Sequence, residues 1–126
     1  YMNRIRNGML LQADPTVIFA IGDFTINRVL NKHLSYDSPY NTYKHKGLPP
    51  GPICTPSALV IDKVLACEQH DYIYFCAKED FSGHHNFAKT LAQHQENARR
   101  YQQALTIYLR KKAQNKALRQ PMRLDE

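Results

Sequence analysis

Apolar positions are spaced most regularly near the C-terminus, where they recur every three or four residues from Thr90 onward. This spacing predicts an amphipathic helix of about two dozen residues, because an α-helix has 3.6 residues per turn. The stripe consists of Leu91, His94, Ala98, Tyr101, Leu105 and Tyr108. Thr90 and Gln93 fit a capping box at the start of the helix. We expect one helix face to pack on a sheet, and the stripe to end before Ala113.

A hairpin pattern precedes this helix. Residues 72–77 are rich in aromatic and β-branched types, and residues 85–87 can pair back across a polar connection that contains Gly83. The sequence therefore predicts an α+β fold, with a small antiparallel sheet flanked by helices and a long amphipathic C-terminal helix. A chain of 126 residues fits one domain.

Shorter elements are predicted in the first half of the chain. Residues 1–8 resemble a helix end, with Gly8 as the residue that stops it. Asp14 and Pro15 fit the N-cap and first position of a helix that Gly22 ends. Since residues 17–21 are all apolar, we expect this helix to be buried on most sides.

Further elements are predicted on both sides of a proline-rich stretch. Residues 24–27 alternate as a short strand does, and residues 30–34 fit one helical turn. Thr55 and Pro56 repeat the N-cap and proline device, which predicts a second helix after them. Its apolar stripe is made of Leu59, Val60, Val64 and Cys67.

The proline-rich stretch itself covers residues 39–56 and holds five of the seven prolines and two of the five glycines. Proline fixes its own φ and keeps the preceding residue out of the helical region, so no helix can run through these residues. The stretch carries Tyr40 and Tyr43, which a flexible linker would lack. Two interpretations stay open: a rigid platform for a concave binding surface, or a stiff loop that connects two packed elements.

The net charge of +6 is concentrated at the C-terminus. Residues 1–96 hold nine basic and nine acidic side chains, whereas residues 97–126 hold eight basic and two acidic ones. A basic helix end complements the helix dipole and keeps the segment solvated, which is the first interpretation. The alternative is contact with an anionic polymer or a membrane surface. Nucleic acid is not an expected partner, because few aromatic side chains are interleaved with the basic ones.

The sequence indicates neither a metal site nor a cofactor. The cysteines are three in number and follow no CxxC spacing. His94 is interpreted as a hydrogen-bonded core histidine, since no further ligands lie at helical spacing beside it. Asp14 is interpreted as a helix cap and not as a catalytic carboxylate. No apolar run approaches the roughly 20 residues that a membrane helix needs.

Several ordered motifs resemble the signature of the YceG-like (MltG) endolytic peptidoglycan transglycosylases. They are residues 11–17 (Leu-Gln-Ala-Asp-Pro-Thr-Val), 38–43 (Ser-Pro-Tyr-Asn-Thr-Tyr) and 47–53 (Gly-Leu-Pro-Pro-Gly-Pro-Ile), followed by residues 74–75, Gly83, residues 85–87, Thr90 and His94. The resemblance covers residues 1 to about 109, and several motifs in family order make it specific.

This resemblance implies a bacterial cell-wall lyase. Such enzymes cut the β-1,4 bond between N-acetylmuramic acid and N-acetylglucosamine in nascent glycan strands and leave 1,6-anhydro ends. The implied parent protein is anchored in the inner (plasma) membrane by one N-terminal helix, with its catalytic domain on the extracytoplasmic side. The implied partners are peptidoglycan glycan strands, together with cell-wall synthesis proteins, and no cofactor is implied.

The resemblance also implies a single acid/base, because the C6 hydroxyl of the sugar replaces water as the nucleophile. In the family this residue is a glutamate on a helix that precedes the equivalent of Tyr1. None of the glutamates of this chain lies in a matching motif; they are Glu68, Glu79, Glu96 and Glu126. We therefore expect residues 1–112 to be the C-terminal part of a catalytic domain, residues 113–126 to be a basic tail, and this chain alone to be inactive.

The residues expected to hold the glycan lie in the motifs. Tyr40 and Tyr43 can stack on sugar faces, and Gln12, Asn41 and Thr42 can bond to acetamido and hydroxyl groups. The alternative for these residues is structural, with the tyrosines wedged into the loop and the amides tying it down. The corresponding alternative for the whole chain is a non-catalytic glycan-binding or scaffold domain.

Overall fold

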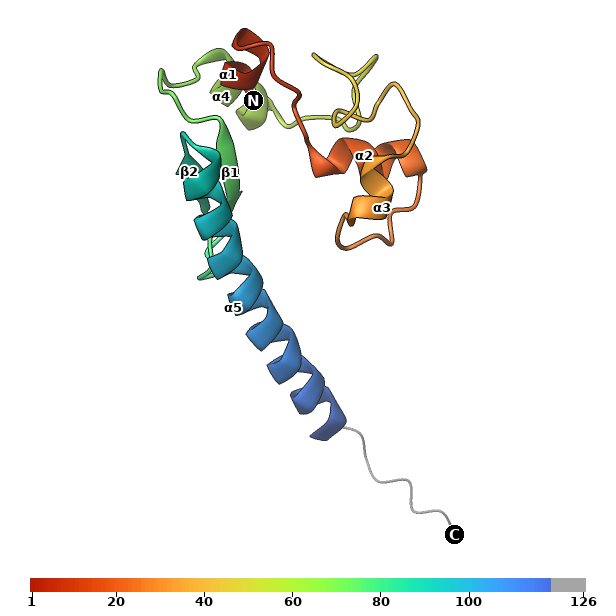
Figure 1. Cartoon of the computed structure of the whole chain (residues 1–126), viewed down its shortest axis with the longest axis vertical. Coiled ribbons are helices and arrows are strands. Elements are labelled where there is room, and N and C mark those ends of the chain that lie inside the picture. The colour runs from red at the N-terminus through yellow and green to blue at the C-terminus, as the bar shows by residue number, and fades with distance from the viewer. Residues whose placement is uncertain (119–126) are drawn as a thin grey trace. The chain divides into compact units, whose positions relative to one another are not determined.

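The computed structural model describes residues 1–118, which fall into two compact units. The first unit comprises residues 1–71 and the second begins at residue 72. The first contains four short helices, and the second contains a two-stranded sheet and one long helix (Figure 1). The predicted α+β class with a small antiparallel sheet and a long C-terminal helix is confirmed. The compact units divide after residue 71, and the assignment of residues 1–112 to one part of a catalytic domain stays a prediction.

The helices of the first unit are α1 (Met2–Arg6), α2 (Asp14–Ile21), α3 (Asn31–Leu34) and α4 (Ala58–Leu65). Its buried residues are few, and polar ones are as frequent as apolar ones. They are Leu11, Ala13 and Val17 together with Arg4, Thr16, Asn41 and Thr42. Because the apolar core is small, buried hydrogen bonds between α2 and the proline-rich stretch contribute much of the specificity of this unit.

Glycines end the first two helices as predicted. Gly8 has φ +64° after α1, and Gly22 has φ +77° as the C-cap of α2. The predicted N-cap role of Asp14 is wrong, because the N-cap is Ala13 and Asp14 is already helical. Within α2 only Thr16 and Val17 are buried, so the helix is less enclosed than its apolar sequence suggests.

Two other predictions in this unit need correction. Residues 24–27 form turns and no strand, because the Asp23 carboxylate accepts hydrogen bonds from the Thr25 amide and hydroxyl and bends the chain there. The N-cap of α4 is Ser57 and not Thr55, since the Ser57 hydroxyl accepts from the Val60 amide. The apolar side chains that α4 presents are all exposed; they are Leu59, Val60, Ile61, Val64 and Leu65.

The second unit begins with the predicted hairpin. Strands β1 (Tyr74–Ala77) and β2 (His85–Ala88) are antiparallel, with Tyr74 opposite Ala88. Helix α5 (Leu91–Leu118) packs on this pair, where the Tyr74 ring stacks on His94 at 5.2 Å between centroids. His94 is therefore a packed, half-buried residue of this unit.

Helix α5 starts as predicted and is longer than predicted. The Thr90 hydroxyl accepts from the Gln93 amide, while the Gln93 side chain accepts from the Lys89 amide. From Thr106 to Leu118 every side chain is exposed. The expected boundary at residue 113 therefore lies inside the helix, because good helix formers continue it after its packing face ends. Pro121, at which a helix cannot continue, lies outside the described residues.

Candidate functional site

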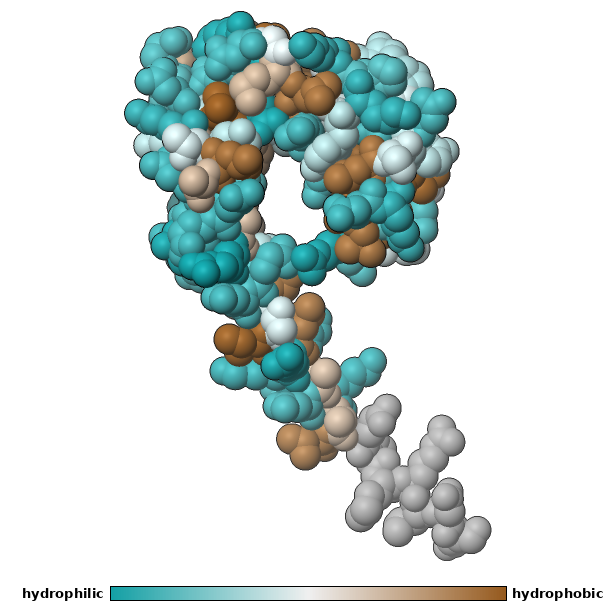
Figure 2. All heavy atoms as spheres, viewed as in Figure 1, coloured by the Kyte–Doolittle hydropathy of each residue, from teal (hydrophilic) through white to brown (hydrophobic). Residues whose placement is uncertain are grey.

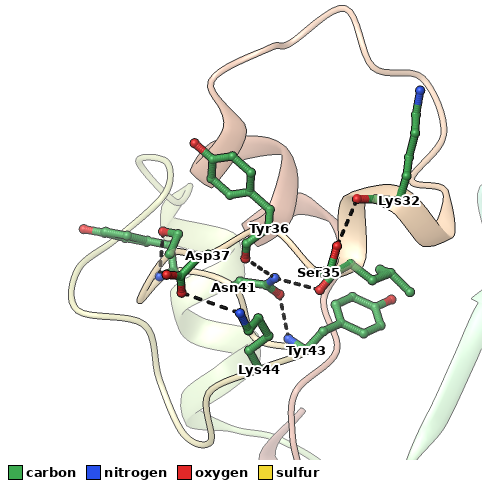
Figure 3. Close-up of polar contacts among 10 residues, drawn as sticks. Lys32, Ser35, Tyr36, Asp37, Asn41, Tyr43 and Lys44 are labelled. Carbon is green, nitrogen blue, oxygen red and sulfur yellow. Dashed lines mark hydrogen bonds and ion pairs between the residues drawn. The ribbon is translucent and has the colours of Figure 1, made fainter.

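The Asn41 side chain ties the proline-rich stretch to the segment that follows α3. Asn41 is fully buried, and its amide nitrogen donates to the backbone carbonyls of Leu34 (2.9 Å) and Tyr36 (2.8 Å). Its side-chain oxygen accepts from the Tyr43 amide at 3.0 Å, as Figure 3 shows. The exposed ion pair of Lys44 with Asp37 spans the same turn at 3.5 Å. The Asn41 amide is therefore fully engaged in holding the loop.

Thr42 joins the same stretch to the start of α2. Its hydroxyl accepts from the Ala13 amide at 3.0 Å and lies 2.8 Å from the Thr16 hydroxyl. Its carbonyl accepts from the Gln12 amide at 3.2 Å. Since Thr42 is 1% exposed, these bonds form in a water-free joint, where each contributes more than it would at the surface.

Tyr40 is half-buried against α2. Its ring lies 5.0 Å from the ring of Phe19, and its amide donates to the Ser38 hydroxyl. A Cβ at Gly51 would lie 3.1 Å from the Tyr40 hydroxyl, so this glycine leaves room for the ring. The Tyr40 ring thus packs between α2 and the loop, and its expected contact with a sugar face stays a prediction.

The Tyr43 side chain points to the carboxylate of Asp14, the residue expected to cap α2. Its hydroxyl donates a 2.5 Å hydrogen bond to Asp14 Oδ1. Burial of the phenol raises the pKa of Tyr43 well above its usual value, and the hydrogen bond to Asp14 raises it further. Burial and the Asp14 charge also raise the pKa of the Tyr1 phenol, so both rings belong to the surroundings of this carboxylate. Asp14 itself is exposed.

Gln12 precedes Asp14 by two residues and has a strained backbone. Its φ of +49° is in the left-handed region, which residues other than glycine rarely adopt. The buried Arg4 guanidinium holds this corner, because its Nη1 donates to the Leu10 carbonyl (2.8 Å) and lies 3.3 Å from Gln12 Oε1. The Gln12 side chain is exposed. Backbone strain of this kind is concentrated at functional sites.

The structure therefore divides the predicted site residues into two groups. Asn41 and Thr42 are buried and use their polar groups inside the loop, so they do not offer them to a ligand in this structure. Gln12 and Asp14 are exposed, and the half-buried Tyr43 bonds to Asp14. We call Gln12, Asp14 and Tyr43 the polar triplet. The roles of Arg4 and of the exposed Asp14 were not predicted. Asp14 lies within the motif at residues 11–17, whereas Arg4 precedes that motif and carries no local signal.

The glutamates among residues 1–118 lie outside this triplet. Glu79 accepts from Asn86 at 2.8 Å and pairs with Arg100 at 3.5 Å, all within the second unit. Hydrogen bonds from its own amide and from Asn86 lower the pKa of Glu79, which opposes the role of a proton donor. Glu96 pairs with Arg99 at 2.6 Å on the exposed side of α5, and Glu68 is exposed after α4.

Metal-ligating side chains do not gather in the part of the chain that the structure describes: residues 1–118 contain no group of three or more histidine, cysteine or carboxylate side chains arranged to hold an ion. The polar triplet provides one carboxylate, one amide and one phenol, which suits hydrogen bonding to hydroxyl and acetamido groups.

Comparison with known proteins places this site in a family. The model of the YceG-like family matches residues 1–100, so the chain belongs to the YceG-like family. This confirms the resemblance drawn from the motifs. The matched range includes the whole first unit, with the polar triplet and the proline-rich stretch, and the hairpin.

Curated relatives and a solved structure agree with this assignment. An endolytic murein transglycosylase of Bacillus subtilis is 44% identical over 101 residues, which cover 80% of this chain and 27% of the relative. One from Streptococcus pneumoniae is 35% identical over 81 residues, 61% of this chain and 15% of the relative. The crystal structure of a yceG-like protein from Listeria monocytogenes shares 43% identity and a TM-score of 0.70 over 75% of this chain and 30% of that one. The chain thus spans about a quarter of the length of the Bacillus relative.

Proposed function

We propose that this chain is the C-terminal part of the catalytic domain of an endolytic murein transglycosylase, and that its polar triplet binds peptidoglycan glycan strands. The proposed reaction of the parent protein cleaves the bond between N-acetylmuramic acid and N-acetylglucosamine and leaves a 1,6-anhydro end. The relatives named above support the reaction class, and their greater length supports a longer parent protein.

The proposal rests on one observation: the loop that carries Tyr43 is held in place by hydrogen bonds of buried side chains. Asn41 and Thr42 bind the loop internally, so Tyr43 and Asp14 meet without the need to order a flexible segment. Preorganised polar groups bind sugars with a smaller entropic cost than mobile ones. In this proposal Asn41 and Thr42 position the site, Gln12 and Asp14 bond to sugar polar groups, and Tyr43 and Tyr40 supply aromatic surface.

The acid/base of the reaction is proposed to come from a part of the parent protein outside these 126 residues. The glutamates of residues 1–118 support this, because Glu79 and Glu96 are ion-paired in the second unit. Asp14 is assigned a binding role, since its Oδ1 already accepts from Tyr43.

Binding is tested with insoluble peptidoglycan and the chain as it stands. The chain is expected to co-sediment with peptidoglycan. Asp14→Asn is expected to weaken this binding by about tenfold or more, since a hydrogen bond to a charged group contributes about 1.5–3 kcal/mol. Gln12→Ala is expected to weaken it several-fold, since a neutral hydrogen bond contributes about 0.5–1.5 kcal/mol. Tyr36→Phe, a change at an exposed phenol outside the triplet, is the matched control. Equal binding by all variants would remove the triplet from the proposal.

Cleavage is tested separately. The 126-residue chain is expected to release no anhydro-muropeptides, whereas a chain extended at its N-terminus through the family's glutamate helix is expected to release them. Release by the short chain would show that one of its own carboxylates, Asp14 or Asp37, carries the chemistry. Binding by the short chain without cleavage by the extended one would favour the non-catalytic glycan-binding alternative.

The location of the parent protein follows the same proposal. A murein substrate places the site on the extracytoplasmic side, and we propose an N-terminal anchor in the inner (plasma) membrane, as the family resemblance implies. Within residues 1–118, no helix has the length and apolar character required to cross a bilayer. Other proteins of cell-wall synthesis are proposed partners of the parent protein.

A further inference from the structure

The distal end of α5 continues beyond the hairpin that supports its first half. Phe81, in the hairpin connection, reaches Tyr101 and Tyr108, with ring centroids 6.1 Å and 5.2 Å apart. From residue 109 onward every side chain of the helix is exposed. Figure 2 shows apolar and polar side chains interspersed on this projecting part. Packing within the second unit thus ends near Tyr108.

The helix face that packs on the hairpin becomes a lysine face beyond this point. Leu105 and Lys112 are seven residues apart, and Lys116 follows four residues later, so they share one side of the helix. Lys111 follows Tyr108 by three residues and flanks this side, about 100° round the helix from Lys112. We call Lys111, Lys112 and Lys116 the lysine face. If this part of α5 continued the face that packs on the hairpin, these three positions would be apolar.

The lysine face also lacks internal neutralisation. In the part of the chain that the structure describes, the ion pairs of α5 involve Arg99 and Arg100 but none of the three lysines. Sequence after Glu96 contains no acidic residue until Asp125. Like charges held on a rigid helix repel one another unless an anionic surface neutralises them.

We infer that the lysine face docks on a bilayer surface that carries anionic phospholipid headgroups. Exposed apolar side chains accompany the cations: Leu109 lies on the stripe of Lys112 and Lys116, and Ile107 precedes Lys111 by four residues. Lysine stems can lie along such side chains while their ammonium groups reach lipid phosphates. Nucleic acid fits less well, because Tyr108 already contacts Phe81 and no second aromatic side chain is interleaved with the lysines for stacking on bases. This inference does not depend on the polar triplet.

The test measures co-sedimentation of the 126-residue chain with vesicles of phosphatidylcholine alone and with vesicles that also contain phosphatidylglycerol. At an ionic strength of about 0.15 M we expect binding to the anionic vesicles only. The variant Lys111→Gln/Lys112→Gln/Lys116→Gln should bind more weakly by roughly fivefold per lysine, on the order of 100-fold in all. The matched control, Lys32→Gln/Lys46→Gln/Lys63→Gln, removes the same charge from exposed lysines of the first unit and should bind as the unmodified chain does.

Three results would overturn the inference. One is equal loss of binding in both triple variants, which would show an effect of net charge alone. Another is equal binding to neutral and anionic vesicles. The third is preference for a duplex DNA fragment, such that DNA displaces the chain from anionic vesicles at the same salt. Circular dichroism of each variant measures its helix content and so checks that only folded proteins are compared.

Discussion

The hydroxyl of Tyr43 donates a 2.5 Å hydrogen bond to the carboxylate of Asp14, which lies 29 residues earlier in the chain. This bond joins the start of α2 to the proline-rich stretch, and Ala13 takes the N-cap position of the helix. The proposed glycan site is therefore a product of two segments that meet only in the folded chain.

Removal of the hydroxyl by Tyr43→Phe separates this bond from the ring. We expect the free energy of unfolding to fall by only about 0.5–1 kcal/mol, because the bond is partly open to solvent. Peptidoglycan binding should fall more than stability suggests, as Asp14 loses the partner that orients it. Urea denaturation and co-sedimentation measure the two effects. Unchanged binding in this variant would mean that Asp14 needs no orientation.

The same bond makes stability depend on alkaline pH. The pKa of Tyr43 is raised in the folded state, chiefly by burial and then by Asp14, whereas an unfolded tyrosine ionises near pH 10. Above about pH 10 the unfolded chain releases this proton more readily, so stability that is fully present at lower pH is lost as pH rises. The loss should be smaller in Tyr43→Phe than in the unmodified chain, by thermal denaturation at several pH values. Parallel profiles would contradict the assignment.

Asn41→Ala should destabilise the first unit strongly. The change leaves two backbone carbonyls and the Tyr43 amide without their buried partner, at a cost of about 3 kcal/mol. The direct bond of Asn41 to sugar that the family motif implies stays a prediction, and this variant tests it. The control is Ser35→Ala, whose exposed hydroxyl bonds only to the Lys32 carbonyl at 3.3 Å. If Asn41→Ala kept full stability but lost peptidoglycan binding, a direct contact would be favoured again.

Two substitutions at Gln12 can separate an effect on stability from an effect on peptidoglycan binding. A left-handed backbone costs a residue other than glycine roughly 1 kcal/mol, so Gln12→Gly should leave stability unchanged or raise it by up to about that amount. Gln12→Ala keeps the strain and should be slightly destabilised by loss of the contact with Arg4. Both variants lack the amide and should bind peptidoglycan more weakly. A marked destabilisation by glycine would show that the Arg4 contact outweighs the strain.

Truncation after Lys112 should leave the melting temperature nearly unchanged, because residues 113–118 are exposed. By contrast, Tyr108→Ala should lower the free energy of unfolding by about 1 kcal/mol through loss of the ring contact with Phe81. Thermal denaturation of both chains is the measurement. A large drop on truncation would reveal a packing role for the end of α5.

Local signals in the sequence determined the elements and the family. The stripe from Leu91 to Leu105 predicted α5, the run at residues 72–77 predicted β1, and Gly8 and Gly22 predicted the ends of α1 and α2. These signals depend on residues within one or two turns of each other, so they can be recognised without knowledge of the fold.

The tertiary structure alone decided what each motif residue does. Asn41 and Thr42 carry polar side chains of the kind that bind sugars, yet their partners at Leu34, Tyr36, Ala13 and Thr16 place both in the interior. Long-range contacts also set the positions of two other motif residues. Asp14 is held by its bond to Tyr43, and the left-handed Gln12 is held by contacts with Arg4 and Thr42. Long-range hydrogen bonds choose among the conformations and roles that local sequence allows, and no local pattern records that choice.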